Sequence, residues 1–360
     1  MDGDAALATL QNESIAAGAS DIHLSPEKET VRVEVRLHGL LQPLKPLAYV
    51  QYEEVLRRIK FMSKLKMNVM NIPQDGQYTI EMTGDSPRTV NVRVATLPSR
   101  FGEAVTLRLL DPKRGIQPLS ELGFPEAMGK ELASLMQLPH GLVIVTGPTG
   151  SGKTTSLYAM LSTIIGTARH IVTLEDPVEY EIKGIVQSEI DADHGFTFAG
   201  GLRSILRHDP NVILVGEIRD LETAQTAIDA ALTGHLVLST LHTNSAVESI
   251  PRLLSMGVSP YTFAPALRAI IAQRLLRTLS DAGRNGTVDP SDPACYSGRT
   301  VLPELLTVTP ALRDLILAQE QESVIAAQAA KEGYLTMKEY GDLLIEAKIT
   351  NKEEVMRVTM

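Results

Sequence analysis

Residues 147–154 read Gly147-Pro148-Thr149-Gly150-Ser151-Gly152-Lys153-Thr154, which matches the phosphate-loop pattern of Gly, four residues, Gly, Lys and Ser or Thr. The short apolar run over 142–145 predicts a buried parallel strand before this loop. Helically spaced apolar residues predict a helix over 155–165 after it. A loop between a strand and a helix N-terminus binds polyphosphate, because unpaired backbone amides point out of the helix end.

Each residue type in this loop has a physical role in holding a nucleotide. The glycines let the backbone curl around phosphates without Cβ clashes, Lys153 supplies positive charge to the β and γ phosphates, and the Thr154 hydroxyl reaches a magnesium ion. The predicted cofactors are therefore ATP and Mg²⁺. The residues predicted to bind them are Gly147, Pro148, Thr149, Gly150, Ser151, Gly152, Lys153, Thr154 and Thr155. The alternative, a chance glycine-rich turn, would not explain the strand before the loop or the helix after it.

Composition limits the class of protein. The 360 residues are 44% hydrophobic and 21% charged, which suits a globular protein of two domains. A formal net charge of -9 argues against indiscriminate binding to nucleic acid, which depends on clustered Lys and Arg. The single cysteine, Cys295, excludes an intramolecular disulfide and suits a reducing compartment. No apolar run approaches about 18 residues, so we expect a cytoplasmic protein that touches membranes only through partners.

The N-terminal part shows both helical and strand periodicity. Apolar spacing predicts helices over 5–18 and 52–67 and strands over 20–24, 31–37, 89–95 and 104–109. Pro73-Gln74-Asp75-Gly76 has the composition of a turn. Together these elements predict a small α+β domain over 1–111.

The last two of these strands bring two like charges together. If their turn is centred between Arg100 and Phe101, then Arg93 and Arg108 face each other across the pair. Like charges placed opposite each other destabilise a sheet unless an anion lies near them. We hypothesise that this anion is the γ-phosphate of a nucleotide held by the other domain. The alternative is two solvated arginines on an open sheet face.

Strands and helices alternate in the rest of the chain. Apolar runs over 142–145, 171–174, 212–215 and 236–238 alternate with helical patterns over 126–136, 155–165, 202–207 and 221–232. This order predicts a mostly parallel sheet with helices on both faces. From residue 310 onward the pattern is helical, with capping boxes predicted at 336–339 and 350–353. We expect this tail to pack on the second domain rather than on a membrane.

Carboxylates follow two of these apolar runs, at the sheet edge where ligands collect. Glu217 follows the run at 212–215, and its carboxylate is predicted to hold the magnesium ion. Glu179 is the first choice for the base that orients or deprotonates the attacking water, and Glu175 is the second. For each acid the alternative is a helix-start or surface carboxylate.

Two histidines and four arginines are weaker candidates. His235 and His242 flank the run at 236–238, and we predict both near the same strand edge, where they could sense the γ-phosphate. The alternative is a structural role for each histidine. The candidate arginines are Arg203, Arg207, Arg219 and Arg252. In a ring they could reach a neighbouring subunit's nucleotide, as arginine fingers do, and in a monomer they would be solvated.

These motifs resemble those of the hexameric secretion ATPases that drive type II secretion and type IV pilus assembly. The resemblance runs from Gly18-Ala19-Ser20-Asp21-Ile22-His23 to the final helices. The phosphate loop corresponds to the Walker A motif. The other boxes of the family match 173–179 (aspartate box), 214–220 (Walker B), and 233–236 through 241–243 (histidine box).

The resemblance implies roles for several residues. It implies that Glu179 is the catalytic base, that Glu217 is the Walker B acid, and that Arg93 and Arg108 engage the γ-phosphate. The four other arginines match family positions without settled roles. It also implies a fold with the following parts: a PAS-like α+β domain over 1–111, a linker over 112–118, a RecA-like core over 119–279, a shortened linker over 280–299 and a helical C-terminal subdomain over 300–360.

Two features depart from the family pattern. Assembly and secretion members carry two Cys-x-x-Cys pairs in a zinc-binding insertion, but here Ser280 and Gly283 stand at the first pair and only Cys295 remains, so zinc is not expected. The additional N-terminal domain of such members is missing, so the sequence is a piece of a longer chain or this member docks differently. The 73–76 segment and the cysteine-free tail resemble the assembly and secretion branch.

We therefore expect a homo-hexameric ATPase motor, peripheral to an inner membrane, that moves a platform protein of a pilus or pseudopilus machine. One alternative is a pilus retraction motor of the same fold. Another is a DNA-translocating ring, which the acidic charge disfavours. The third is a scaffold that binds nucleotide without cleaving it, which Lys153, Glu179 and Glu217 argue against.

Overall fold

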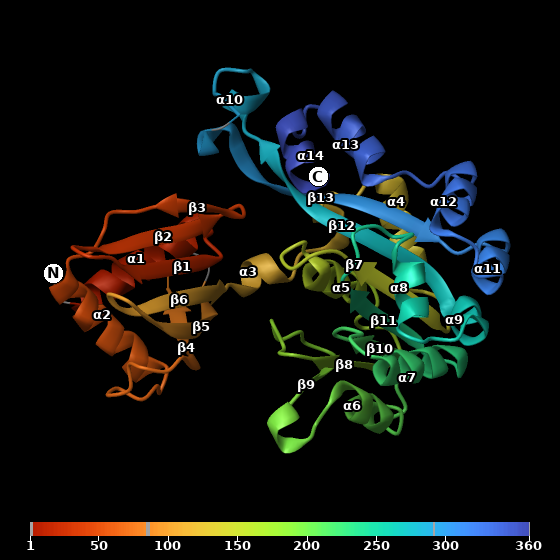
Figure 1. The fold of residues 1–360 in the computed structure, drawn as a ribbon, viewed down its shortest axis with the longest axis horizontal. Helices are drawn as coiled ribbons and strands as arrows, with labels where there is room; N and C mark the ends of the chain where they lie inside the picture. The colour runs from red at the N-terminus through yellow and green to blue at the C-terminus, as the bar shows by residue number, and fades with distance from the viewer. Residues whose placement is uncertain (1–2, 84–86, 291, 360) are drawn as a thin grey trace. The chain divides into compact units, whose positions relative to one another are not determined.

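A computed structural model describes residues 3–83, 87–290 and 292–359 of the chain. The chain folds as two compact units, Met1–Gly115 and Ile116–Met360 (Figure 1). The boundary falls inside the linker predicted over 112–118. Each unit has its own sheet and its own hydrophobic core.

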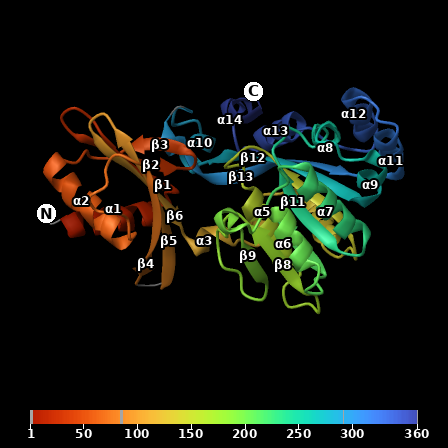
Figure 2. The ribbon, with the colours of Figure 1, turned by 60° about the horizontal axis from the view of Figure 1, so that its bottom comes forward.

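The first unit is an antiparallel sheet in the order β3-β2-β1-β6-β5-β4, with α1 and α2 on one face (Figure 2). Its elements are α1 (Gly3–Ala17), β1 (Asp21–Pro26), β2 (Val31–Leu37), β3 (Leu40–Pro43), α2 (Tyr49–Met62), β4 (Gln74–Met82), β5 (Arg88–Ser99), β6 (Gly102–Leu110) and α3 (Pro112–Gly115). Apolar side chains of the sheet and of both helices form one core, among them Ile22, Leu24, Tyr52 and Ile59. The predicted α+β character is confirmed.

The β5–β6 hairpin has the register that the sequence predicts. Ser99 pairs with Gly102, so the turn consists of residues 100–101, and Arg93 pairs with Arg108. Both arginines lie on the face away from the core, because the valines and leucines at alternate positions of both strands are buried.

The turn predicted at residues 73–76 is wrong, because Gln74 and Gly76 are part of β4. Gly76 pairs with Val94, and a Cβ at this glycine would lie 2.7 Å from the carbonyl oxygen of Ser63. The glycine therefore permits close approach of two backbone segments rather than a chain reversal.

The helix predicted over 52–67 is α2, and it ends earlier. Lys64 has a φ of +56°, which no α-helix accommodates. Beyond it the chain is held by Gln74, whose Oε1 accepts from Lys66 N at 2.8 Å and whose Nε2 donates to Val69 O at 2.8 Å. Apolar spacing continued past the point where these tertiary contacts end the helix.

The second unit is built on a sheet in the order β13-β12-β7-β11-β10-β8-β9. Its strands are β7 (Gly141–Thr146), β8 (Ile171–Glu175), β9 (Val186–Glu189), β10 (Val212–Val215), β11 (Leu236–Leu241), β12 (Leu267–Leu279) and β13 (Tyr296–Thr307). All neighbouring pairs are parallel except β12 and β13, which are antiparallel. The predicted mostly parallel sheet is confirmed, although β9, β12 and β13 were not predicted.

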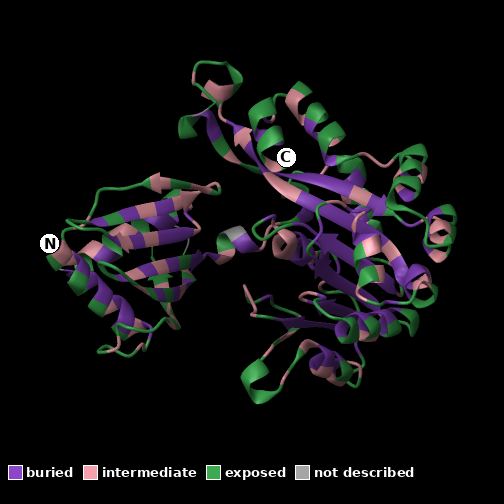
Figure 3. Cartoon of the chain, in the orientation of Figure 1, coloured by how far each residue is buried: buried purple, intermediate pink, exposed green. Residues whose placement is uncertain are grey.

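Helices cover both faces of this sheet. They are α4 (Glu126–Leu135), α5 (Lys153–Ser162), α6 (Phe198–Ile205), α7 (Leu221–Leu232), α8 (Ser249–Ser255), α9 (Pro260–Ala266), α11 (Pro310–Leu317), α12 (Glu322–Lys331), α13 (Met337–Glu346) and α14 (Lys352–Thr359), whereas the short helix α10 (Asp281–Arg284) lies in the connection between β12 and β13. Along β7, Leu142 and Ile144 join one core and Val143 and Val145 join the other. The central strands are therefore buried on both sides (Figure 3).

The tail helices pack on this unit, as predicted. Leu312, Ile316, Met337 and Val355 all belong to the core on one face of the sheet. None of the helices in the described part of the chain is long and apolar enough to span a bilayer. The helical subdomain predicted over 300–360 needs correction, because its first residues belong to β13.

One of the two predicted capping boxes is present. Thr336 and Glu339 form a reciprocal capping box at the start of α13. The box predicted at 350–353 is wrong, because Thr350 instead donates its hydroxyl to Arg277 O at 2.9 Å. Asn351 accepts from Glu354 N at 3.0 Å and caps α14 in its place.

Candidate nucleotide site

The predicted phosphate loop lies between a strand and a helix, because β7 ends at Thr146 and α5 begins at Lys153. Gly147, Gly150 and Gly152 have φ values of +145°, +79° and +88°. A Cβ at Gly147 would also lie 2.5 Å from the carbonyl oxygen of Gln273. The loop conformation therefore requires glycine at these positions, and it brings successive backbone amides to the N-terminus of α5.

Lys153 lies half-buried at this helix start. Its Nζ donates to Gly147 O at 2.7 Å and to Pro148 O at 3.1 Å. Burial lowers the pKa of the Lys153 ammonium to about 8, although the nearby carboxylate of Glu217 opposes this shift. A cation that has lost part of its hydration and faces the loop is ready to bind phosphate oxygens.

Two further features of the loop fit a bound nucleotide. The buried Ser151 hydroxyl has no hydrogen-bond partner among the described residues. The Thr154 and Thr155 side chains lie half-buried in the first turn of α5, directly after Lys153. Among the described residues, no three His, Cys, Asp or Glu side chains form a metal cage. A hydroxyl from Thr154 and a carboxylate from Glu217 fit magnesium, which takes most of its ligands from phosphate and water.

Glu217 lies just past the carboxyl end of β10, within an array of charges. One carboxylate oxygen forms an ion pair with Arg219, and the other lies 3.4 Å from His242 Nε2. Arg219 also lies 3.6 Å from Asp176 Oδ2. The structure thus brings together the predicted residues Glu217, His242 and Arg219, with Lys153 close enough for its pKa to respond to the acid.

Hydrogen bonds between neighbouring strand ends hold these side chains in place. Thr240 Oγ1 donates to Gly216 O at 2.7 Å, which joins the end of β11 to the segment carrying Glu217. Thr243 N donates to Thr146 Oγ1 at 2.9 Å, which joins the residue after His242 to the strand before the phosphate loop. The position of His242 is therefore linked directly to the strand that supports the loop.

The two candidate bases lie in different environments. Glu175 is 4% exposed and accepts hydrogen bonds from Tyr158, Thr173 and Gln187. Both of its oxygens are engaged in this buried network, so it supports the fold instead of activating water. Glu179 lies half-buried in the segment between β8 and β9, and it stays the candidate base.

His235 does not belong to the site, and its prediction is wrong. It precedes β11, whereas His242 follows the strand, so the two imidazoles lie roughly 20 Å apart along it. His235 Nδ1 instead lies 2.9 Å from Ala230 O, and its own carbonyl accepts from Gly141 N at the start of β7. Parallel pairing with β7 places His235 at the edge opposite the phosphate loop.

Of the four candidate arginines, only Arg219 reaches the charge array. Arg203 Nη1 donates to Glu222 at 2.7 Å, which joins α6 to α7. Arg207 donates to Arg203 O at 3.1 Å, and Arg252 lies exposed on α8. Binding of nucleotide by these three arginines stays a prediction.

In the first unit, an acid lies beside one of the two facing arginines. Arg108 Nε is 3.0 Å from Asp21 Oδ1, and Arg36 Nε is 3.8 Å from Asp21 Oδ2. Asp21 is 5% exposed, and its backbone pairs in register with Arg36 on one side and with Arg108 on the other. The sequence of the hairpin alone does not reveal this acid, because Asp21 reaches Arg108 only through the pairing of β1 with β6. Binding of phosphate by Arg93 and Arg108 stays a prediction.

Sequence reasoning also missed Gln273, which is fully buried on β12. Its Nε2 donates to Ser151 O at 2.7 Å, so it supports the phosphate loop from behind. A glutamine directly after the apolar run 269–272 was the available signal, because a buried amide needs partners.

Comparisons with known proteins identify the family of this chain. The family model described as "Type II/IV secretion system protein" matches residues 5–357. Type II secretion system protein HxcR of Pseudomonas aeruginosa is 42% identical over 349 residues, which cover 95% of this chain and 74% of that protein. Type II secretion system protein E of Klebsiella pneumoniae is 43% identical over 374 residues, with 96% and 74% covered.

Among solved structures, the pilus retraction motor PilT with bound ADP superposes with a TM-score of 0.70 at 31% identity, covering 97% of this chain and 95% of that one. The resemblance seen in the motifs is thus confirmed over nearly the whole sequence, in both units. This chain belongs to the Type II/IV secretion system protein family.

Proposed function

We propose that this chain, an ATPase of the secretion family, acts as a homo-hexameric motor that drives assembly of a pilus or pseudopilus. The observation that carries the proposal is the convergence of Lys153, Glu217 and His242 at the edge of the parallel sheet from which the phosphate loop emerges. Charge of both signs at the end of a nucleotide loop serves phosphoryl transfer to water.

The chain's own residues supply the chemistry as follows. The loop amides and Lys153 bind the phosphates, while Thr154 and Glu217 would hold a magnesium ion, which neutralises charge on the β and γ phosphates when bound. Glu179 orients and deprotonates the attacking water. His242, whose Nε2 lies 3.4 Å from Glu217 Oε2, reports the state of the terminal phosphate to the loop that follows it.

The arginines of the first unit complete this scheme. Arg93 and Arg108 engage the γ-phosphate of the same subunit or of a neighbour, and loss of that phosphate releases them. Arg108 has a substitute partner in Asp21, so its charge stays compensated when no phosphate is near. When Arg108 exchanges the γ-phosphate for Asp21, hydrolysis is converted into movement of one unit against another.

The relatives bear on the direction of force. Identity to the type II secretion proteins is 42–43%, compared with 31% to the retraction motor PilT. This difference favours assembly or secretion through an inner-membrane platform protein over retraction. The net charge of -9 disfavours a DNA translocase, and turnover unaffected by added DNA would agree.

The experiment is steady-state ATP turnover, with gel filtration of the same samples. We expect Glu217→Gln to lower kcat by about 100-fold or more, because its carboxylate acts on charge that develops in the transition state. Glu346→Gln, on the exposed side of α13, is the matched control and should turn over ATP at the wild-type rate. Robust turnover by Glu217→Gln would contradict the assignment, and a monomer at all concentrations would contradict the ring.

A further inference from the structure

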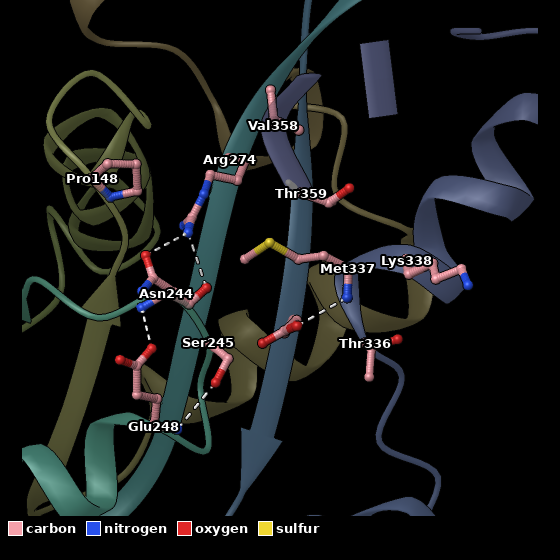
Figure 4. A pocket seen from close by; sticks show the side chains of 11 residues that line it. Pro148, Asn244, Ser245, Glu248, Arg274, Thr336, Met337, Lys338, Val358 and Thr359 are labelled. Carbon is pink, nitrogen blue, oxygen red and sulfur yellow. Dashed lines mark hydrogen bonds between the residues drawn. The ribbon is translucent and has the colours of Figure 1, made fainter. Parts of the chain in front are cut away.

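A pocket of about 660 Å³ lies within the second unit, next to Pro148 of the phosphate loop (Figure 4). One wall is the segment after β11, including Asn244, Ser245 and Glu248. The opposite wall is the tail, with Met337 of α13 and the end of α14. The pocket therefore lies between the segment that follows His242 and the C-terminal helices, so a bond between its two walls joins that segment to the tail.

One buried carboxylate makes that connection. Glu304 lies on β13 and is 5% exposed. Its Oε2 accepts from Ala246 N at 2.9 Å, on the loop side, and from Tyr334 OH at 2.7 Å, on the tail side. Its Oε1 accepts from Met337 N at 2.9 Å, at the first residue of α13. Loop and tail thus share a single acceptor group.

The loop end of this connection leads to the nucleotide site. Ala246 lies in the segment 243–248, which is also held by Arg274, whose Nη2 donates to Asn244 O at 3.1 Å. At its start, this segment bonds to Thr146 through Thr243, directly after His242. Moving the Ala246 end of so short a segment would shift the residue that contacts Glu217.

We propose that Glu304 is a positioning residue, through which docking of α13 sets the 243–248 segment and thereby aligns His242 with Glu217. If a buried carboxylate loses one of its hydrogen-bond donors, its charge stays desolvated without compensation, which costs much free energy. The loop and the tail must therefore move together. This inference rests on the proposed function, because it assigns a catalytic consequence to a contact inside the same unit.

The first test compares substitutions of Glu304 and Glu339, which both accept hydrogen bonds from backbone amides at the start of α13. In Glu304→Gln one oxygen becomes an amide donor, so the side chain keeps its volume but can no longer accept from Ala246 N, Tyr334 OH and Met337 N together. Glu339→Gln weakens the capping box of the same helix without touching the loop. We expect Glu304→Gln to lower kcat about tenfold, with KM for ATP changed less than twofold. A displacement of a catalytic group by about 1 Å can lower the rate about 100-fold, and we expect a smaller displacement here. Glu339→Gln should keep the wild-type kcat, and equal kcat values for both variants would overturn the proposal.

The second test removes the donor on the tail side and leaves Glu304 intact. Met337→Pro deletes the amide at the first position of α13, where proline is tolerated, and Thr336 before it already has the extended backbone that proline requires. Met337→Ala removes the same side chain but keeps the N–H. We expect the proline variant to have the lower kcat of the two, by severalfold. A proline variant as active as the alanine variant would contradict the coupling.

Hydrogen exchange separates this inference from the proposed function. In the full-length chain, Glu304→Gln should speed amide exchange in the 243–248 segment relative to Glu339→Gln, whether or not the protein hydrolyses ATP. An inactive wild type with faster exchange in Glu304→Gln would overturn the proposed function and keep the coupling. Unchanged exchange in that segment would overturn the coupling.

Discussion

At the scale of single residues, burial decides which charged groups bind ligand and which support the fold. Glu175 ends β8 and Glu217 lies just past the end of the neighbouring strand β10, yet Glu175 is enclosed by hydroxyl and amide donors while Glu217 faces Arg219 and His242. Sequence position alone could not separate them, because both follow apolar runs. The side chains around them, including Tyr158 from α5, make the difference.

Lys153 gives a prediction of pH dependence. Its ammonium has a pKa of about 8, below the ordinary value, because it is partly buried. As pH rises through about 8 the free enzyme loses this positive charge, so we expect kcat/KM for ATP to fall between pH 8 and 9.5. The folded chain also binds fewer protons here than the unfolded chain between about pH 8 and 10.5, so this residue makes the free energy of unfolding rise with pH across that window.

The pH profile of kcat/KM checks the first effect, and thermal unfolding of wild type and Lys153→Met checks the second. The methionine variant should lack the rise of stability that is attributable to the lysine. A wild-type kcat/KM that stays level from pH 7 to 9.5 would argue against a lowered pKa at the phosphate loop.

At the scale of elements, close backbone approach is as important as periodicity. Gly76 lies in β4 where a Cβ would meet both Ser63 O at 2.7 Å and Leu65 Cδ2 at 2.8 Å. We expect Gly76→Ala to destabilise the first unit by about 1–3 kcal/mol, because the backbone of Ser63 must move. Calorimetry of Gly76→Ala and of a control variant, Gly129→Ala, would measure the change in stability.

Gly129→Ala is the matched control, since nothing lies within 4 Å of an added Cβ on α4. Alanine is the better helix former, so we expect this control to stabilise its unit by about 0.5–1 kcal/mol. A Gly76→Ala protein that melts with the wild type would show that β4 does not need this close contact.

The sequence predicted the elements whose pattern is local and lost those that depend on partners. The phosphate loop, β7, β10 and α7 follow from apolar runs and helical spacing over short windows. The polar strand β4 and the capping of α14 by Asn351 do not, because Gly76 and Thr350 are positioned by residues far along the chain. His235 was misplaced for another reason: the strand between it and His242 was predicted over 236–238, but the observed strand Leu236–Leu241 is longer and places the two histidines at opposite edges of the sheet.

At the scale of the whole molecule, the residues of the proposed mechanism belong to two units that fold around separate cores. Arg93 and Arg108 face each other on one of them, and the phosphate loop belongs to the other. We expect Arg108→Gln to lower kcat by about 10³-fold while ATP still binds, as for arginines that stabilise the transferring phosphate.

Arg36→Gln is the control for this prediction, because Arg36 flanks Asp21 on the opposite side, in the neighbouring strand. It should keep most of the turnover. Measurements of kcat, together with ATP binding by fluorescence, distinguish the variants. Normal turnover by both Arg93→Gln and Arg108→Gln would remove the arginines from the reaction and leave the second unit to act alone.

The β12–β13 hairpin has a consequence for how this family diversifies. Gln273 supports the phosphate loop near the middle of β12, and the strand then continues to Leu279, roughly 20 Å further along. The connection at the hairpin tip, which carries α10, is thus separated from the catalytic residues by the paired strands β12 and β13. Insertions or deletions at that tip can therefore occur in evolution without moving the catalytic residues. The tip is the part of this unit where we expect an additional segment to be gained or lost.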